Sequence, residues 1–184
     1  VGFLRSIGSN IRDFKPSRCI IVFDGKGGSQ RRKKMFPDYK ANRTGKFKPK
    51  QVEGCELNDD DLKASMRWQL QRVMMYLDKL PVQIVCMDHI EADDAIAYIC
   101  KQYFEEHSNK IRIVSTDRDF LQLVSDQIEV YSPVKKVTYS PKTIQTELDL
   151  HPDNYLLYRM VTGDTSDNIP GISGLGLKTI IKYF

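Results

Sequence analysis

The sequence has few cysteines and histidines, and their spacing excludes two common kinds of scaffold. No Cys-x-x-Cys pair occurs, and the three histidines show no zinc-ligand spacing. We therefore expect neither a zinc site nor a disulfide framework. We expect reduced core thiols of a cytosolic-type protein at four positions: Cys19, Cys55, Cys86 and Cys100.

Long hydrophobic runs are also missing. No stretch reaches the roughly 18 apolar residues that a membrane helix needs, and no signal-peptide pattern is present. The apolar fraction of 41% and the charged fraction of 28% are ordinary for a globular protein. We expect a cytoplasmic monomer without membrane contact, built as one domain with a small appendage.

The sequence begins and ends inside helical patterns. Apolar residues recur at helical spacing directly after Val1, for example Phe3, Ile7 and Ile11, and an amphipathic pattern runs up to Phe184. We expect both ends to be cut, as in a fragment.

Three short apolar runs rich in valine and isoleucine predict buried strands at Cys19–Phe23, Val82–Met87 and Ile111–Ser115. Helical patterns lie between them, notably at Asp59–Leu80 and Ala92–Phe104. This alternation predicts an α/β fold with a mainly parallel sheet. In such sheets, ligands bind beyond the carboxyl ends of the strands.

Acidic residues gather where these strands end or where the following helices begin, and their local sequence offers them no basic partner. They are eight in number: Asp24, Glu91, Asp93, Asp94, Asp117, Asp119, Asp164 and Asp167. Acids converging at one edge of a sheet would repel one another unless a hard cation lay among them. We expect magnesium or manganese there.

The opposite charge is concentrated at Lys26–Lys50, which holds ten Lys or Arg residues and one acid, Asp38. Its glycines and prolines predict a loop or partly helical excursion that extends to about Asp61. The acids near that end, Glu56 and Asp59 to Asp61, suit the start of the next helix. A basic strip beside an acidic metal site is the charge pattern of a phosphodiester-cutting enzyme.

The segment His151–Phe184 reads as helix, glycine-rich loop and helix. Gly174 and Gly176 leave backbone N–H groups free to face a phosphate, and Lys178 adds positive charge. The pattern fits a clamp on a nucleic-acid strand, and it fits an ordinary turn between packed helices equally well.

Four motifs in order carry a resemblance to a known family. They are FDGKGGSQRRKKMFPDYKANR, IEADDA, IVSTDRDFLQL and VTGDTSDNIPGISGLGLKT. Together they resemble the 5′ nuclease (flap endonuclease) family, particularly phage and bacterial polymerase-associated 5′-to-3′ exonucleases, over nearly the whole chain. The resemblance implies a PIN-like core at residues 1–150, with an arch or loop at about 26–61. It also implies the start of a helix–three-turn–helix DNA clamp at 151–184.

The resemblance also implies roles for individual residues. Asp24, Glu91, Asp93 and Asp94 resemble ligands of a first metal region, Asp164 and Asp167 resemble ligands of a second, and Asp117 and Asp119 lie between the two. Lys40 and Arg43 resemble the cations that contact the scissile phosphate, and Tyr39 resembles a ring that stacks on the terminal base. Arg31 or Arg32 resembles a DNA-contacting arginine. Gly174, Gly176 and Lys178 resemble the clamp, where the family implies a potassium ion.

In one respect the chain departs from the family. The family's earliest metal ligand is an aspartate at the end of a strand that precedes the helix matching Val1–Phe14, and this sequence starts after it. We expect that this N-terminal strand has been cut off, and the alternative is a divergent member without that ligand. In either case the resemblance does not establish that the fragment itself is active.

The implied activity is Mg²⁺-dependent 5′-to-3′ hydrolysis of DNA flaps and of RNA primers paired to DNA, with two or more ions and Mn²⁺ as a substitute. The expected partners are branched or nicked duplex DNA and RNA–DNA hybrids, with a polymerase or single-strand-binding protein as further candidates. Two alternatives stay open: a PIN-type ribonuclease, and a structure-specific DNA-binding member of the fold that has lost catalysis.

Overall fold

The computed structural model describes residues 2–43, 58–104 and 110–183. These residues divide into two compact units, which we describe separately. The first unit comprises Val1–Phe23 and Thr44–Cys86, and the second comprises Asp24–Arg43 and Met87–Phe184. None of the described helices is long and apolar enough to span a membrane.

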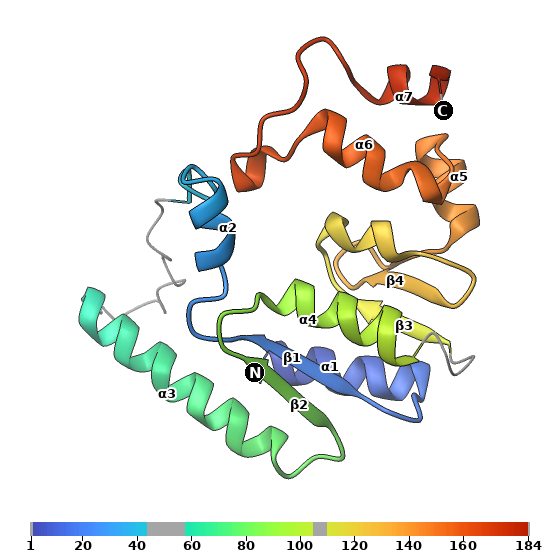
Figure 1. The fold of residues 1–184 in the computed structure, drawn as a ribbon. Helices are drawn as coiled ribbons and strands as arrows, with labels where there is room; N and C mark the ends of the chain where they lie inside the picture. Colours follow the sequence, from blue (N-terminus) through green and yellow to red (C-terminus); the bar gives the residue numbers. More distant parts are fainter. Residues whose placement is uncertain (1, 44–57, 105–109, 184) are drawn as a thin grey trace. The chain divides into compact units, whose positions relative to one another are not determined.

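The first unit contains two long helices and a two-stranded sheet, whose last strand residues pass into the second unit (Figure 1). Its elements are α1 (Gly2–Phe14), β1 (Ile20–Asp24), α3 (Asp59–Leu77) and β2 (Gln83–Met87). The ring centroids of Phe3 on α1 and Phe23 on β1 lie 6.1 Å apart. These bounds confirm two predicted strands and the long helix to within three residues.

The acids that the sequence places at the start of α3 take part in its N-terminal cap. The Asn58 side chain accepts hydrogen bonds from the Asp60 and Asp61 N–H groups, and the Asp61 side chain accepts one from the Asn58 N–H. This capping box satisfies N–H groups that a helix start leaves without partners. Glu56, expected to act with them, lies outside the described residues.

The second unit carries a three-stranded sheet in the order β3-β4-β5 (Figure 1). Strands β3 (Ile111–Val114) and β4 (Ile128–Ser132) are parallel, with Ile111 opposite Ile128. Strand β5 (Val137–Tyr139) pairs antiparallel with β4. The expected parallel pairing occurs in β3 and β4, but the three predicted strands do not form one sheet, because β1 and β2 pair separately. Strands β4 and β5 were missed by the sequence reasoning.

Short helices make up much of the rest of the second unit, and several of the acids lie in them or at their starts. These helices are α2 (Gln30–Met35), α4 (Ala92–Tyr98) with the π-helical turn η1 (Ile99–Phe104), η3 (Arg118–Leu123), α5 (Pro141–Leu148), η4 (Pro152–Asn154), α6 (Tyr155–Thr162), η5 (Thr165–Asp167) and α7 (Leu177–Tyr183). The sequence predicted a single helix at Ala92–Phe104, whereas the structure changes from α to π geometry at Ile99.

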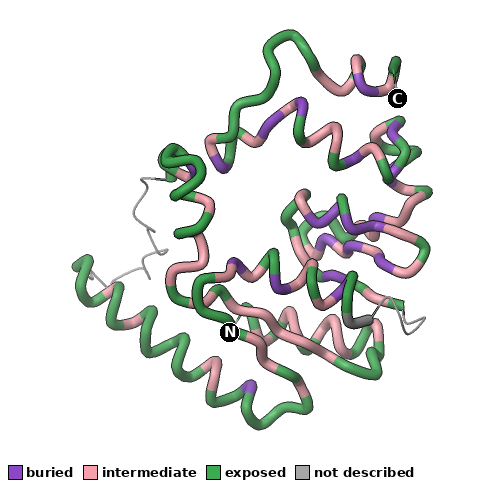
Figure 2. The backbone as a smooth tube through the Cα atoms, in the orientation of Figure 1, coloured by how far each residue is buried: buried purple, intermediate pink, exposed green. Residues whose placement is uncertain are grey.

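The core of the second unit lies between the sheet and the helices that follow it. Ile128 and Val130 of β4, Leu121 of η3, Tyr155 of α6 and Ile180 of α7 are at most 2% exposed. Figure 2 shows buried residues gathered on β4 and α6, while α3 of the first unit is exposed along most of its length. The second unit is thus the better packed of the two.

The cysteines only partly follow the sequence prediction. Cys100 is buried, Cys19 is half-buried and Cys86 is exposed, so the expectation of a core position is wrong for Cys86. Cys55 lies outside the described residues.

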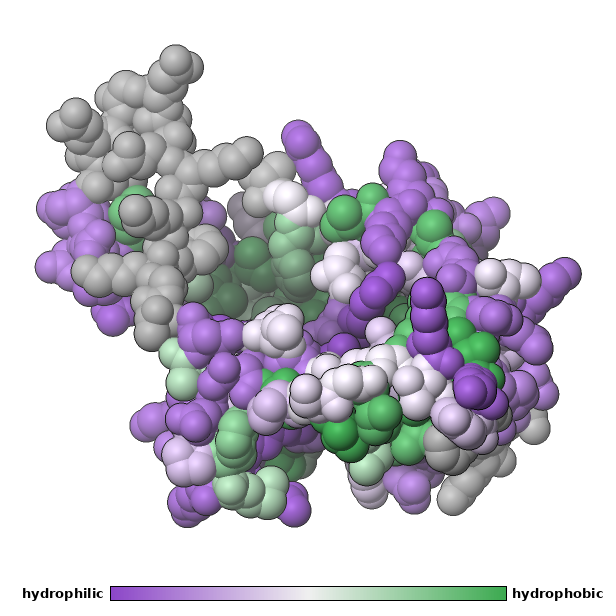
Figure 3. All heavy atoms as spheres, turned by 90° about the horizontal axis from the view of Figure 1, so that it is seen from above, coloured by the Kyte–Doolittle hydropathy of each residue, from purple (hydrophilic) through white to green (hydrophobic). Residues whose placement is uncertain are grey.

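Apolar side chains interrupt the largely hydrophilic face in Figure 3, and several exposed apolar residues lie on α3, including Trp68 and Met75.

Candidate active site

Five of the eight candidate acids line one pocket of the second unit, which has a volume of about 390 Å³. They are Asp24, Glu91, Asp93, Asp117 and Asp167. Lys40 and Arg43 line the same pocket. Asp24 and Asp117 thus lie together with Glu91 and Asp93, as predicted, whereas Asp94 is not among the lining residues.

Local backbone geometry places each acid. Asp24 ends β1 and accepts a hydrogen bond of 2.7 Å from the Ala92 N–H, so it also caps the start of α4. Asp117 follows β3 and accepts 2.9 Å from the Asp119 N–H at the start of η3. Turns of this kind suit aspartate because its short side chain reaches a backbone N–H two residues on.

A glycine allows the chain to leave Asp24. A Cβ built on Gly25 would overlap the carbonyl of Met87, the last residue of β2. Only a residue without a side chain permits this close approach. The sequence Asp24-Gly25 therefore fixes both the acid and the path of the loop beyond it.

Glu91 is the most deeply buried acid of the pocket, at 5% exposed. Its carboxylate pairs with Arg32 at 3.0 Å and with Lys40 at 3.1 Å, and it accepts a hydrogen bond of 3.1 Å from the Tyr39 hydroxyl. Three donors compensate the cost of burying one charge. Burial raises the pKa of Tyr39 to about 12, so its hydroxyl stays protonated and donates.

These contacts distinguish the two candidate arginines. Arg32 also pairs with Asp94 at 2.7 Å, whereas Arg31 is exposed and has no ion pair with a described residue. Tyr39 is 5% exposed. Base stacking on its ring stays a prediction, which would require the ring to leave this position.

Asp167, in the loop after α6, contacts residues of the segment 38–43. It pairs with Arg43, and Lys40 Nζ lies 3.9 Å away. The backbone adds to this: Lys40 N–H donates to the Asp167 carbonyl at 2.8 Å, and Asn42 donates to the Thr165 carbonyl at 2.7 Å. Asn168 donates back to the Asp38 carbonyl at 2.9 Å. We call this set of contacts the 38–43 clasp.

The remaining acids, Asp119 and Asp164, share a partner that the sequence reasoning missed. Arg159 of α6 lies 2.6 Å from Asp119 and 2.5 Å from Asp164. The prediction that no local residue neutralises these acids is therefore wrong for Asp164, since Arg159 precedes it by only five positions. Gly163, with φ +70°, lies between the two residues in the sequence.

Asp93 faces other acids. Burial together with the neighbouring charges of Asp117, Asp24 and Glu91 raises the pKa of Asp93 to about 6. Like charges held this closely are stabilised by a cation among them. In the described part of the chain, no three Asp, Glu, His or Cys side chains form a metal-binding group as they stand. The donor chemistry nonetheless fits hard divalent cations, which prefer carboxylate oxygens.

Comparison with known proteins identifies the family of the chain. The family model described as "5'-3' exonuclease, N-terminal resolvase-like domain" matches residues 1–149. The chain belongs to this family. Members of the 5′-3′ exonuclease family similar to it include the 5′-3′ exonuclease of Aquifex aeolicus, 32% identical over 98% of this chain and 56% of the relative. DNA polymerase I of Mycobacterium tuberculosis is 31% identical over 99% of this chain and 19% of the polymerase.

The chain thus spans about half the length of the bacterial exonuclease that it matches. Among solved structures, a bacteriophage T5 flap endonuclease complex with DNA and metal ions has a TM-score of 0.76 at 23% identity, covering 98% of this chain and 64% of the other. The catalytic core of Rad2 with DNA substrate has a TM-score of 0.54 at 19% identity, covering 98% and 50%. These likenesses show a shared α/β fold with a parallel sheet and helices.

The predicted clamp residues, Gly174, Gly176 and Lys178, are not among the residues that line the acidic pocket. Gly174 has φ +79°, and a Cβ at either Gly174 or Gly176 would meet nothing within 4 Å. Lys178 is exposed on α7. These features leave the backbone accessible, while DNA binding and a potassium ion at this loop stay predictions.

Proposed function

We propose that this chain forms the catalytic part of a divalent-metal-dependent 5′-to-3′ nuclease. It would hydrolyse phosphodiester bonds in DNA flaps and in RNA primers paired to DNA, during replication or repair. The observation that carries the proposal is the convergence of five acids, Lys40 and Arg43 on one pocket in a chain of the 5′-3′ exonuclease family.

The acids divide into the groups that would hold the metal ions. Asp24, Glu91, Asp93 and Asp94 would form a first region and Asp164 and Asp167 a second, with Asp117 and Asp119 between them. Bound Mg²⁺, or Mn²⁺ in its place, would activate the attacking water and neutralise charge on the departing oxygen. The T5 structure holds metal ions and DNA, and we extend both to this chain as part of the proposal.

The protein cations now paired with these acids would change partners. Removing one member of a buried ion pair costs about 3–5 kcal/mol, so Lys40 would leave Glu91 only as another cation replaces it. Released, Lys40 and Arg43 would face the scissile phosphate, where negative charge accumulates in the transition state. Tyr39 would continue to donate to Glu91 and keep that carboxylate oriented.

The exchange suits the positions of these residues. Lys40 and Arg43 contact candidate ligands from the 38–43 clasp, whose backbone is fixed independently through Asn42 and Asn168. Their side chains can therefore move without moving the backbone that carries them. Two cations held next to the reacting phosphate would also position the strand for in-line attack.

The partners follow from this substrate class. We propose that the chain acts as a monomer, in the cytoplasm, on branched or nicked duplex DNA. The similarity to about a fifth of DNA polymerase I makes a polymerase a reasonable companion in lagging-strand maturation or repair.

The test is cleavage of a 5′-labelled flap duplex by the purified chain with Mg²⁺ and with EDTA. The proposal predicts Mg²⁺-dependent cutting near the flap junction and none in EDTA. Tight flap binding without cutting would favour a non-catalytic DNA-binding protein. Cutting of single-stranded RNA in preference to the flap would favour a PIN-type ribonuclease.

A further inference from the structure

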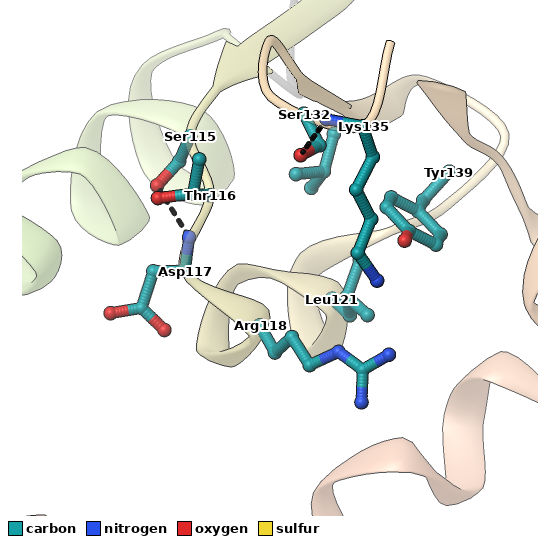
Figure 4. Close-up of a pocket in the computed structure, with 9 residues that line it drawn as sticks. Ser115, Thr116, Asp117, Arg118, Leu121, Ser132, Lys135 and Tyr139 are labelled. Atoms are coloured by element: carbon teal, nitrogen blue, oxygen red, sulfur yellow. Dashed lines mark hydrogen bonds between the residues drawn. The ribbon is translucent and has the colours of Figure 1, made fainter. Parts of the chain in front are cut away.

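A second, smaller pocket of the second unit lies next to the acidic pocket and shares Asp117 with it. Two cations, Arg118 and Lys135, line it together with hydroxyl-bearing residues at the ends of β3, β4 and β5 (Figure 4). Those hydroxyl residues are Ser115, Thr116, Ser132 and Tyr139. Figure 4 shows the Asp117 carboxylate and the Arg118 guanidinium on opposite sides of the chain, so the acid faces away from this pocket.

The two cations differ from those of the acidic pocket in their partners. Lys40 and Arg43, which line the acidic pocket, each pair with a candidate ligand acid. Arg32 and Arg159, which lie outside its lining, do the same. Neither Arg118 nor Lys135 forms an ion pair with any residue that the structure describes. Two like charges that line one small pocket repel each other unless an anion lies between them.

The hydroxyl groups are prepared to donate to such an anion. Ser115 Oγ accepts a hydrogen bond of 3.0 Å from the Asp117 N–H, and Ser132 Oγ accepts one of 3.4 Å from the Lys135 N–H. Each hydroxyl therefore uses a lone pair for the backbone and keeps its own proton for another acceptor. Ser132 is only 5% exposed, so its position at the pocket wall is fixed.

The size of the pocket selects the ligand. Its volume is about 30 Å³, roughly twice the 10–15 Å³ that holds one water molecule. Such a space admits two oxygens of a phosphate group and is too small for a nucleobase. Arginine and lysine are the side chains that proteins most often use to bind phosphate.

We infer that this pocket binds a non-reacting phosphate of the nucleic-acid strand, through Arg118 and Lys135 with Ser132 as a hydroxyl donor. The inference rests on the proposed nuclease function, because the shared Asp117 places this phosphate next to the one being cut. Either an internal phosphodiester or a terminal 5′-phosphate carries the required chemistry. Bound there, it fixes the strand's register relative to the acids.

The test is binding without chemistry. The ¹⁵N-labelled chain is titrated in EDTA with inorganic phosphate, with a short 5′-phosphorylated oligothymidylate and with its unphosphorylated counterpart. We expect saturable shifts of the Ser132, Lys135 and Tyr139 amides. Tighter binding of the phosphorylated oligonucleotide assigns the pocket to the terminal phosphate, and equal binding assigns it to an internal phosphodiester.

The double variant Arg118→Gln/Lys135→Gln should weaken oligonucleotide affinity at least about tenfold. Without these two charges, fewer counterions are released from the oligonucleotide when it binds. Lys142→Gln, an exposed lysine on α5, is the matched control and should change affinity less than about twofold. Lys135→Gln alone serves if the double variant fails to fold. Absent pocket shifts, or equal affinity in the double variant and the control, would overturn the inference.

A parallel assay of Mg²⁺-dependent flap cleavage by the unmodified chain separates the two proposals. Phosphate-dependent shifts without cleavage would retain the pocket as a strand-phosphate site and overturn the nuclease. Cleavage without shifts at the pocket would retain the nuclease and overturn the pocket.

Discussion

The two neighbouring pockets share Asp117 but use positive charge in opposite ways. In the acidic pocket, Arg43 pairs with Asp167, and Lys40 pairs with Glu91. In the smaller pocket, Arg118 and Lys135 have no ion-pair partner among the described residues. The first arrangement balances charge within the protein, and the second leaves positive charge for a ligand to balance.

This difference separates two uses of basic residues near a strand of nucleic acid. A cation that stabilises a buried carboxylate contributes little attraction to a distant phosphate, because its field is largely cancelled. An unpaired cation attracts the phosphate directly and releases counterions when it binds. We therefore propose that the paired cations act in the reaction step and the unpaired ones in strand binding.

The largest effect should follow from removing the acid that the two pockets share. Asp117→Asn should lower flap cleavage at least about 100-fold, since even residues that only support metal ligands cost 10–100-fold. DNA affinity in EDTA should change little. Asp126→Asn, an exposed acid in the turn before β4, should cut at the normal rate. Near-normal rates in Asp117→Asn, measured in single turnover, would remove it from the site.

A somewhat smaller loss should follow from Arg43→Ala, which removes charge from the reacting phosphate. We expect single-turnover cleavage to fall by about 100-fold, the scale of losing one transition-state donor. Lys33→Ala is the control, because Lys33 is an exposed base of α2 outside the pocket lining. Equal rates for the two variants would show that Arg43 serves only as the partner of Asp167.

A moderate effect should follow from loosening the 38–43 clasp. Asn42→Ala removes the hydrogen bond to the Thr165 carbonyl, and we expect kcat to fall about tenfold, the lower end for supporting residues. Amide hydrogen exchange should accelerate at Lys40, whose N–H donates to Asp167. Gln145→Ala, an exposed amide on α5, should change neither. A kcat loss with unchanged exchange would contradict a positioning role.

The smallest effect concerns salt dependence. In EDTA, Arg118→Gln should reduce the slope of log affinity against log salt concentration by about 0.7, the value for one contact with a single strand. Arg43→Ala should reduce it less, because Arg43 stays paired with Asp167 without metal. Filter binding of a single-stranded oligonucleotide over a salt series measures both. A larger change in Arg43→Ala would reverse the assignment of the two pockets.

The sequence predicted the frame of the fold and most of the acidic pocket. The strand before Asp24 is a continuous apolar run and the strand before Asp117 is rich in isoleucine and valine, so their carboxyl ends could be located from composition. Strands β4 and β5 were missed because β4 alternates buried with half-buried residues and β5 is only three residues long. The alternation in Ile128–Ser132 is the signal that would have found β4.

The pairing of charges was the part that the sequence could not give. Arg32 and Glu91 are 59 positions apart, and no local rule joins them. Arg159 offered a signal, since it lies on the last turns of a helix before a glycine turn and an aspartate. Arg118 and Lys135 line one pocket because the turn between β4 and β5 brings Lys135 there. Only the structure could show this placement.

The most direct test of the account is whether the acidic pocket binds divalent cations in place of its protein cations. Mn²⁺ titration of the purified chain, followed by the electron paramagnetic resonance of free Mn²⁺, measures this without any cleavage. We predict saturable binding that weakens at least about tenfold in Asp93→Asn, because Asp93 lies among three other acids. Absent binding, or identical binding by Asp93→Asn and the unmodified chain, would contradict the account.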